Sequence, residues 1–343
     1  MNLGALDPTL RYTLAFLVPL LAALVFTPLA GKLAGRLGVI DRPGGHKTHL
    51  HATPYLGGIA VAAGMLAIAL VVGGASGKLL AVLASAAVLA LVGLLDDVRG
   101  LNPLLRLGYE MTAALGLWSM GIRAGVAGQA WVDLPLTIVW VVAVMNAFNF
   151  VDNMDGVAAT VAAASALGIA ALTGSNGDYL VASLALAVAG ATLGFLRFNF
   201  PPARIFLGDA GSMFLGFLVA ALVLQLDLPV GLSLPRTLAA VLVAGVPLFD
   251  LSLVVMARMR EHRPLWQGGS DHSAHRLQRR GFGKPRVVLV AGGGQLACSV
   301  IAFVVYKRSF PVVVTVAAVM AIGWVALLWW FLHHPTVLEE IAE

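Results

Sequence analysis

The chain has 343 residues, of which 59% are hydrophobic and 11% charged, and its mean hydropathy is +0.91. Soluble domains carry about 25% charged residues, so this composition excludes a soluble fold and makes the lipid bilayer the main solvent. The net charge of +5 does not indicate nucleic-acid binding, because the basic residues lie in short loops between apolar runs, as topology signals or ligands for anions do. The single cysteine, Cys298, excludes a disulfide framework and a cysteine-based metal site.

Eleven apolar stretches approach the length of about 20 residues that a membrane-spanning helix needs. We therefore predict an all-α, polytopic membrane protein with 10–11 transmembrane helices in a single domain, residues 1–343. The first stretch lacks a basic n-region and is too long for a cleaved signal, so we expect it to remain as a helix. The approximate centres of the stretches are Val18, Ala67, Val88, Ala114, Val139, Ala166, Ala187, Leu218, Leu242, Leu296 and Val319.

Lysine and arginine residues predict the orientation of these helices. With eleven spans, one side carries 16 of the 22 basic residues and the other carries 6. Cytoplasmic loops hold the excess of Lys and Arg, so the richer side is predicted to be cytoplasmic and the N-terminus to lie outside. The same side holds all eight histidines, and it also holds the aspartates Asp41, Asp96, Asp97, Asp152, Asp155, Asp209 and Asp271. We expect an active site at this face.

The first polar loop, residues 41–51, contains His46, Lys47, His49 and His51. Mixed Lys and His side chains suit an anionic ligand, although a plain loop explains them nearly as well. We take Lys47 as a candidate substrate-binding residue.

The adjacent carboxylates Asp96 and Asp97 follow an apolar run and are expected at the C-terminal end of its helix. Two neighbouring acids at a membrane boundary repel each other unless a cation or an arginine compensates them. A solvated helix end is the alternative. The helix dipole disfavours acids at this end, which favours a functional pair.

A polar segment at 146–156 is the most specific signal in the chain. Asn146, Asn149, Asp152 and Asp155 follow one another at intervals of three residues, a spacing that keeps them along one face of a helix. Polar groups inside an apolar run are costly in lipid. An interhelical polar contact explains one or two of them, not four.

The segment 206–212 contains Gly208, Asp209 and Gly211 and is expected to open the next helix. Glycine lets a backbone approach a phosphate, and a helix N-terminus favours anions. On this motif alone, Asp209 is equally well explained as the helix cap.

The loop 258–286 is the longest polar segment and the most basic, and it contains Asp271, His272, His275 and Arg276. Two histidines three residues apart can suit zinc, but no third ligand is evident, and we favour phosphate binding by His and Arg. A positive-inside loop accounts for the arginines but not for the histidines.

Two further acids stand inside apolar runs. Asp250 is expected near the inner end of the ninth span, as a catalytic group or in an ion pair with Arg258 or Arg260. Glu110 follows Arg106 by four residues and is expected to form a helical salt bridge with it.

Acids, amides, basic groups and glycine turns at a bilayer interface suit phosphoryl transfer between a water-soluble substrate and a lipid. A transporter or lipid flippase is the alternative from another class. It predicts charged groups near the middle of the membrane and accessible from both sides, whereas here they gather on one face.

Four motifs resemble those of the polyprenyl-phosphate N-acetylhexosamine-1-phosphate transferases, which include the phospho-MurNAc-pentapeptide translocases. They are Leu-Asp-Asp-Val at 95–98, Asn-Ala-Phe-Asn-Phe-Val-Asp-Asn-Met-Asp-Gly at 146–156, Phe-Leu-Gly-Asp-Ala-Gly-Ser at 206–212 and Asp-His-Ser-Ala-His-Arg-Leu at 271–277. Their order is the order of the family, and the resemblance extends over nearly all of 41–277.

The resemblance implies that N-acetylhexosamine-1-phosphate passes from a UDP-sugar to polyprenyl phosphate, the first membrane step of a cell-envelope glycan pathway at the bacterial inner membrane. It implies Mg²⁺ as cofactor, with Mn²⁺ as the alternative, and it is compatible with a homodimer. The candidate catalytic residues are Asp96, Asp97, Asp152 and Asp155, and the candidate metal ligands are Asp209 and Asp97. The candidate substrate-binding residues are Lys47, Asn146, Asn149, Gly208, Asp271, His272, His275 and Arg276.

Two departures from the family pattern bear on the donor. The pentapeptide translocases carry three consecutive histidines where this chain has His272-Ser-Ala-His275, which argues against UDP-MurNAc-pentapeptide and for a smaller UDP-N-acetylhexosamine, of which we favour UDP-GlcNAc. Asn153 replaces a glycine that is common in the family, with no consequence that we can assign.

For the reaction itself, we favour direct attack of the lipid phosphate on the β-phosphate of the donor, with Asp96 orienting or deprotonating the lipid phosphate. A double displacement through an aspartyl-phosphate stays open.

Overall fold

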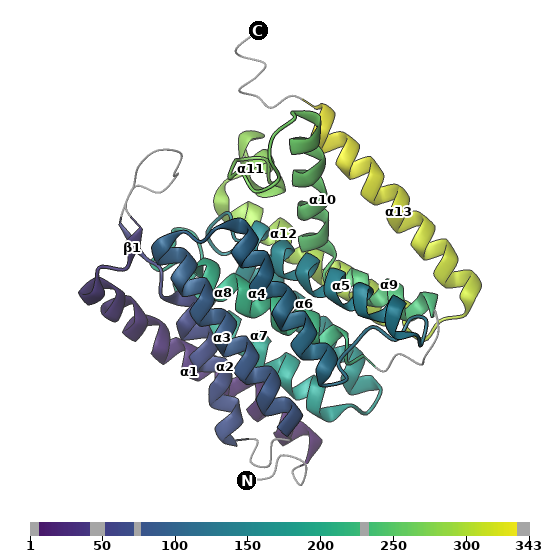
Figure 1. Ribbon diagram of the computed structural model, residues 1–343, viewed down its shortest axis with the longest axis horizontal. Helices are drawn as coiled ribbons and strands as arrows, with labels where there is room; N and C mark the ends of the chain where they lie inside the picture. The colour runs from purple at the N-terminus through teal and green to yellow at the C-terminus, as the bar shows by residue number, and fades with distance from the viewer. Residues whose placement is uncertain (1–6, 42–51, 72–76, 227–232, 335–343) are drawn as a thin grey trace.

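A computed structural model describes residues 7–41, 52–71, 77–226 and 233–334 of the chain. Thirteen helices and one two-stranded sheet make up these residues (Figure 1). The elements in chain order are α1 (Pro8–Leu37), β1 (Ile40–Asp41), β2 (Thr53–Pro54), α2 (Gly57–Val71), α3 (Gly77–Arg99), α4 (Pro103–Ser119), α5 (Ala130–Val151), α6 (Val157–Ser175), α7 (Tyr179–Asn199), α8 (Gly208–Val223), α9 (Leu234–Leu242), α10 (Gly245–Arg260), α11 (Ser273–Arg279), α12 (Lys284–Val305) and α13 (Phe310–His333). The prediction of an all-α fold is confirmed.

Each of the eleven predicted stretches contains a helix, but the helices differ in length. Within the described residues, seven helices are long and apolar enough to cross a membrane, namely α1, α3, α5, α6, α7, α12 and α13, and the bent pair α9–α10 makes an eighth if it counts as one span. Helices α2, α4 and α8 have 15, 17 and 16 residues and fall below the usual length of a span. The chain is therefore a multi-pass membrane protein, and the total of 10–11 spans stays a prediction.

Helix α8 is the centre of the bundle. It packs against α2, α3 and α5, and every residue of α8 except Asp209 is buried. Glycines allow this approach, because a Cβ on Gly58 would lie 2.1 Å from the backbone nitrogen of Gly211. The N-terminus of α8 and the single carboxylate in its first turn are thus fixed among three neighbouring helices.

Helices α9 and α10 meet at a 76° bend between Leu242 and Gly245. The side chain of Gln295, on α12, is fully buried beside this break. Its amide donates hydrogen bonds to the carbonyl oxygens of Leu242 (3.1 Å) and Val243 (3.0 Å), and its oxygen accepts one from the backbone N–H of Val246 (2.9 Å). One side chain therefore provides hydrogen-bond partners for backbone groups at the end of α9 and at the start of α10. Without these partners, each backbone group in apolar surroundings would cost several kcal/mol.

Helix α13 lies at the edge of the molecule beside α10 (Figure 1), and only 11% of its apolar segment is buried. Its C-terminal end is fastened to α11 by Arg276, whose guanidinium donates to the carbonyl oxygen of Phe331 at 2.8 Å. At the opposite end of the bundle, Lys307 donates to the carbonyl oxygen of Ser175 at 3.0 Å. The loop before α13 and the C-terminal end of α13 thus contact different parts of the bundle.

Candidate active site

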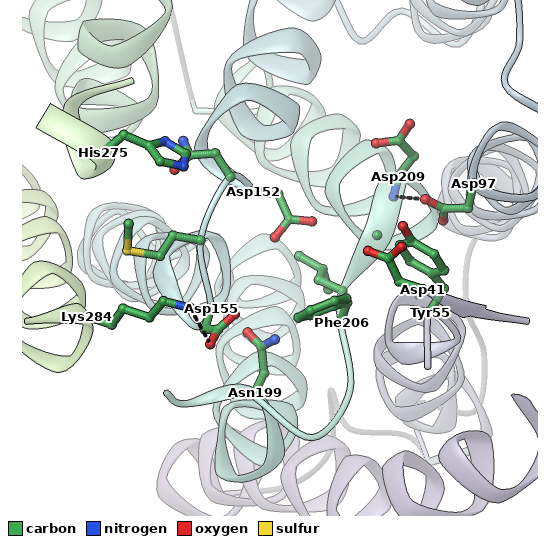
Figure 2. A pocket seen from close by; sticks show the side chains of 14 residues that line it. Asp41, Tyr55, Asp97, Asp152, Asp155, Asn199, Phe206, Asp209, His275 and Lys284 are labelled. Atoms are coloured by element: carbon green, nitrogen blue, oxygen red, sulfur yellow. Dashed lines mark hydrogen bonds and ion pairs between the residues drawn. The ribbon is translucent and has the colours of Figure 1, made fainter. Parts of the chain in front are cut away.

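Two cavities meet at the end of the bundle where α8 begins. The first, called here the acidic cavity, has a volume of about 420 Å³ and is lined by Asp41, Asp97, Asp152, Asp155, Asp209, His275 and Lys284 among others (Figure 2). The second, called here the long cavity, has a volume of about 680 Å³. Asp152, Asn153 and Asp209 line both cavities, so they form the wall where the two meet.

The long cavity has a mixed polar and apolar lining. Its polar lining residues include Asp96, Arg106, Asn149 and His272. Its apolar lining residues include Leu101, which precedes α4, Leu104 and Leu107 on α4, and Leu251 and Val255 on α10. A cavity of this kind suits an amphiphile with a charged head and a hydrocarbon tail.

Asp97 and Asp209 are connected through the backbone of α8. Oδ1 and Oδ2 of Asp97 accept hydrogen bonds from the backbone N–H groups of Asp209 (2.9 Å) and Ala210 (3.2 Å). Asp97 therefore caps α8 from a neighbouring helix, a role that the sequence had offered to Asp209. The Asp209 carboxylate instead accepts a hydrogen bond from Asn149 Nδ2 at 2.5 Å and lies 3.4 Å from Arg106 Nη1.

Gly208 makes room for this cap. It has a φ of +70°, and a Cβ built there would lie 2.6 Å from Oδ2 of Asp97. Gly93, on α3, is equally tight, with a Cβ position 2.4 Å from the carbonyl oxygen of Asp209. The space that glycine provides is used by the Asp97 carboxylate, and direct contact between Gly208 and a phosphate stays a prediction.

Asp96 faces a different partner from its neighbour. Its Oδ1 accepts a hydrogen bond from the backbone N–H of Leu101 (2.7 Å), and its Oδ2 lies 3.4 Å from Arg106 Nη1. Arg106 also lies 3.5 Å from Glu110, which confirms the predicted helical salt bridge. Arg106 thus connects Asp96 to Asp209, and its buried Nη2 has no hydrogen-bond partner within the described residues.

The sequence analysis did not identify Arg106 as a site residue, because the expected salt bridge to Glu110 accounted for its charge. The Asn-Pro pair at 102–103 could have indicated it, since this pair predicts that a new helix begins directly after the two aspartates. Asn102 caps α4, and the new helix carries the guanidinium back towards Asp96.

The polar segment 146–156 is helical only in its first half. Asn149 donates to Asp209 and, at 3.0 Å, to Ser212, while Asn146 donates to Glu110 at 2.5 Å. Helix α5 ends at Val151, so the expected helical stripe of four polar residues is wrong beyond Asn149. The chain turns there through Gly156, whose φ is +76°.

This turn sends Asp152 and Asp155 in different directions. Figure 2 shows Asp152 between His275 and the Asp97–Asp209 pair, and Asp155 beside Lys284. Asp155 lies 3.4 Å from Lys284 Nζ and accepts a hydrogen bond from the backbone N–H of Ala203 at 3.2 Å. Burial, followed by the charges of Asp209 and Asp97, raises the pKa of Asp152 well above its ordinary value. A cation beside these carboxylates would relieve that repulsion.

The histidines of the segment 271–276 reach both cavities. His272 lines the long cavity and His275 lines the acidic cavity. Asp271 pairs with Arg263 (2.6 Å) and Arg258 (3.3 Å), and these arginines lower its pKa although burial alone would raise it.

Arg276 donates to the carbonyl oxygens of Asp271 and Phe331 and lines neither cavity. The structure thus gives Asp271 and Arg276 structural partners, and their substrate-binding roles stay predictions. Lys47 lies outside the described residues.

The donor set around the acidic cavity suits a hard divalent cation. Asp97, Asp152 and Asp209 bring carboxylate oxygens to one cavity, and Mg²⁺ prefers oxygen ligands. In the described parts of the chain, no three His, Cys, Asp or Glu side chains are grouped to hold a metal by themselves. Mg²⁺ does not need such a cage, since it usually takes one or two protein carboxylates and completes its shell with water and substrate phosphates.

Comparison with known proteins identifies relatives over most of the chain. Residues 79–227 match the model of glycosyl transferase family 4. The chain is 32% identical over 295 residues to a probable undecaprenyl-phosphate N-acetylglucosaminyl 1-phosphate transferase of Bacillus subtilis, covering 82% of this chain and 81% of the relative.

It is also 33% identical to the decaprenyl-phosphate N-acetylglucosaminephosphotransferase of Mycobacterium leprae, over 80% of this chain and 79% of the relative. A phospho-N-acetylmuramoyl-pentapeptide-transferase of Moorella thermoacetica is 34% identical over 72% of this chain and 89% of that protein. Overall identity therefore does not distinguish the two kinds of relative.

Proposed function

Because the chain belongs to glycosyl transferase family 4, as its relatives and its motifs show, we propose that it transfers N-acetylglucosamine-1-phosphate from UDP-GlcNAc to polyprenyl phosphate. The products are polyprenyl-diphospho-N-acetylglucosamine and UMP. The observation that carries the proposal is the shared wall of Asp152, Asn153 and Asp209 between an acidic cavity and a cavity whose lining includes several Leu and Val side chains. The acidic cavity takes the water-soluble donor, and the long cavity takes the phosphate and first isoprene units of the lipid.

In this arrangement an oxygen of the lipid phosphate attacks the β-phosphorus of the donor, and the bond from that phosphorus to the bridging oxygen breaks to release UMP. Arg106 lines the long cavity beside Asp96, so its guanidinium is placed to bind the lipid phosphate. Asp96, held by Leu101 and Arg106, orients that phosphate or removes its remaining proton.

Asp209 and Asp97 are the proposed Mg²⁺ ligands, and Asp152 adds its negative charge to the same cavity. A cation held by these carboxylates would supply positive charge to the diphosphate oxygens and to the UMP leaving group. Lys284 and His275 line the far side of the acidic cavity, where a polar donor meets them.

The choice of donor rests on the last loop, since overall identity does not decide it. The spacing His272-Ser-Ala-His275 departs from three consecutive histidines and favours UDP-GlcNAc over UDP-MurNAc-pentapeptide. The test is UMP release by the purified enzyme with polyprenyl phosphate and UDP-GlcNAc, UDP-GalNAc or UDP-MurNAc-pentapeptide, with a reaction lacking the lipid as control. Strong preference for the pentapeptide donor would overturn the assignment.

We propose that the end of the molecule carrying the site faces the cytoplasm, where nucleotide sugars are found. A cysteine introduced at the exposed Ser270, in a Cys298→Ser background, should resist an impermeant thiol reagent in intact cells and react after permeabilisation. The matched control is Asn176→Cys, exposed between α6 and α7 at the opposite end, which should react in intact cells. The reverse pattern would invert the orientation.

A further inference from the structure

Asp250 is an almost fully buried acid, 1% exposed, on helix α10. The sequence suggested Arg258 or Arg260 as its partner, and the structure corrects this. Arg258 pairs with Asp271, and Arg260 contacts His333 at 3.1 Å. The partners of Asp250 lie at the start of α11: its Oδ2 is 2.8 Å from Nδ1 of His272, and its Oδ1 accepts from the backbone N–H (2.7 Å) and the hydroxyl (2.6 Å) of Ser273.

This contact determines which ring nitrogen of His272 carries the proton. A carboxylate only accepts hydrogen bonds, so Nδ1 of His272 is the donor. Nε2 is then the free position of the neutral ring, and it makes no hydrogen bond among the described residues. The Phe150 ring meets the imidazole edge-on, with centroids 5.6 Å apart at 89°, and holds its plane.

Asp250 and His272 line different cavities, and this determines which of them can contact a substrate. His272 lines the long cavity together with Asp209 and Arg106. Asp250 and Ser273 line a separate apolar cavity of about 280 Å³ on the other side and do not line the long cavity. Asp250 is therefore shielded from the substrates and reaches them only through the imidazole.

We propose that Asp250 is a positioning residue that fixes His272 in the Nδ1–H tautomer and thereby presents Nε2 to the phosphates in the long cavity. The inference rests on the proposed function, since it takes those phosphates to be its substrates. Nε2 accepts a hydrogen bond while the ring is neutral and donates one when the ring holds a second proton, whose charge Asp250 balances. Carboxylate partners of metal-ligating histidines are typically worth about 10–100-fold in activity when removed, and we expect a loss of that size for this pair.

The first experiment separates positioning from simple helix capping. Asn caps a helix as well as Asp does, so Asp250→Asn keeps an acceptor for the Ser273 N–H. Its amide N–H, however, would face Nδ1 of His272 and drive the proton to Nε2. We expect kcat for UMP release to fall about 10–100-fold with little change in the KM of the donor and in the unfolding temperature. Ser273→Ala, the matched control, loses one contact of the same carboxylate and should keep near-normal kcat.

The second experiment tests whether Asp250 acts through His272. If it does, the double variant Asp250→Asn with His272→Gln should be no slower than His272→Gln alone. Independent losses that multiply in the double variant would overturn the inference, as would normal kcat in Asp250→Asn.

A third readout does not depend on turnover. Nitrogen-15 spectra of histidine-labelled protein should show a Nδ1–H ring that is missing in His272→Gln and changes tautomer in Asp250→Asn. A wild-type enzyme that releases no UMP from any donor would refute the proposed function alone. An Nε2–H ring for His272 in the wild-type protein would refute the positioning role alone.

Discussion

Asp97 and Asp209 lie 112 residues apart, yet Oδ1 of Asp97 accepts a hydrogen bond from the backbone N–H of Asp209 at 2.9 Å. This contact fixes the first turn of α8 against α3 and leaves the Asp209 side chain free to face Asn149 and Arg106. It also separates the roles of two adjacent acids, since Asp97 supports a helix N-terminus while Asp96 pairs with Arg106.

Asp209→Asn should therefore lower turnover without lowering stability. The α8 amides keep their cap, so the unfolding temperature should stay close to that of the wild type, while the loss of an anionic metal ligand should reduce UMP release by orders of magnitude. Asp97→Ala is the contrasting variant, because it removes the cap as well and should also cost about 1 kcal/mol of stability. Near-normal turnover of Asp209→Asn at limiting Mg²⁺ would remove Asp209 from the proposed metal site.

Gly208→Ala should destabilise the protein through both a strained backbone and a clash with Asp97. Gly100→Ala has the backbone strain alone and therefore separates the two effects. Gly208 and Gly100 both have positive φ, +70° and +63°, and alanine in that conformation costs about 1–2 kcal/mol. A Cβ at Gly100 meets nothing within 4 Å, whereas at Gly208 it would meet the Asp97 carboxylate. Thermal unfolding should show a larger loss for Gly208→Ala than for Gly100→Ala, together with a loss of UMP release. Equal losses would show that the contact with Asp97 can relax freely.

Gln295→Leu should destabilise the bend between α9 and α10. The change leaves the carbonyl oxygens of Leu242 and Val243 and the N–H of Val246 without their partner, at about 1–3 kcal/mol for each group that stays unsatisfied. Gln225→Leu is the matched control, since among the described residues the Gln225 side chain makes one hydrogen bond, to the carbonyl oxygen of Ala221 at the end of α8. Thermal unfolding in detergent should separate the two variants, and equal melting temperatures would contradict the role given to Gln295.

His275 should make the stability of the protein depend on pH. Burial, followed by electrostatic interaction with His272 and with the positively charged Arg279, lowers the pKa of His275 from 6.5 to about 4. In the unfolded chain the His275 ring is therefore protonated below pH 6.5, whereas in the folded protein it is protonated only below about pH 4. The free energy of unfolding therefore keeps its full value above pH 6.5. It decreases as the pH falls from 6.5 towards 4, by up to about 3 kcal/mol.

Unfolding temperatures at neutral and mildly acidic pH check this expectation. His275→Gln cannot take up the proton, so its unfolding temperature should fall less on acidification than that of the wild type. His334→Gln, which changes an exposed histidine, should follow the wild type. An unchanged pH response in His275→Gln would show that other groups dominate the acid sensitivity.

The amino-acid sequence determined the membrane class, a helix in each apolar stretch, and the segments that build the site. Apolar length and polar interruptions are local properties, so they can be read without knowing which helices touch. The motifs at 95–98, 146–156 and 206–212 all reach the two cavities for this reason.

Only the tertiary structure decided how these groups are paired. Whether Asp97 or Asp209 caps α8 depends on the approach of α3 at Gly93 and Gly208. Whether Asp250 meets an arginine or His272 depends on where the loop after α10 returns. Such pairings join residues that are tens to more than a hundred positions apart. Their geometry comes from helix packing, whereas hydrophobic length and residue spacing are the same in any arrangement of the helices.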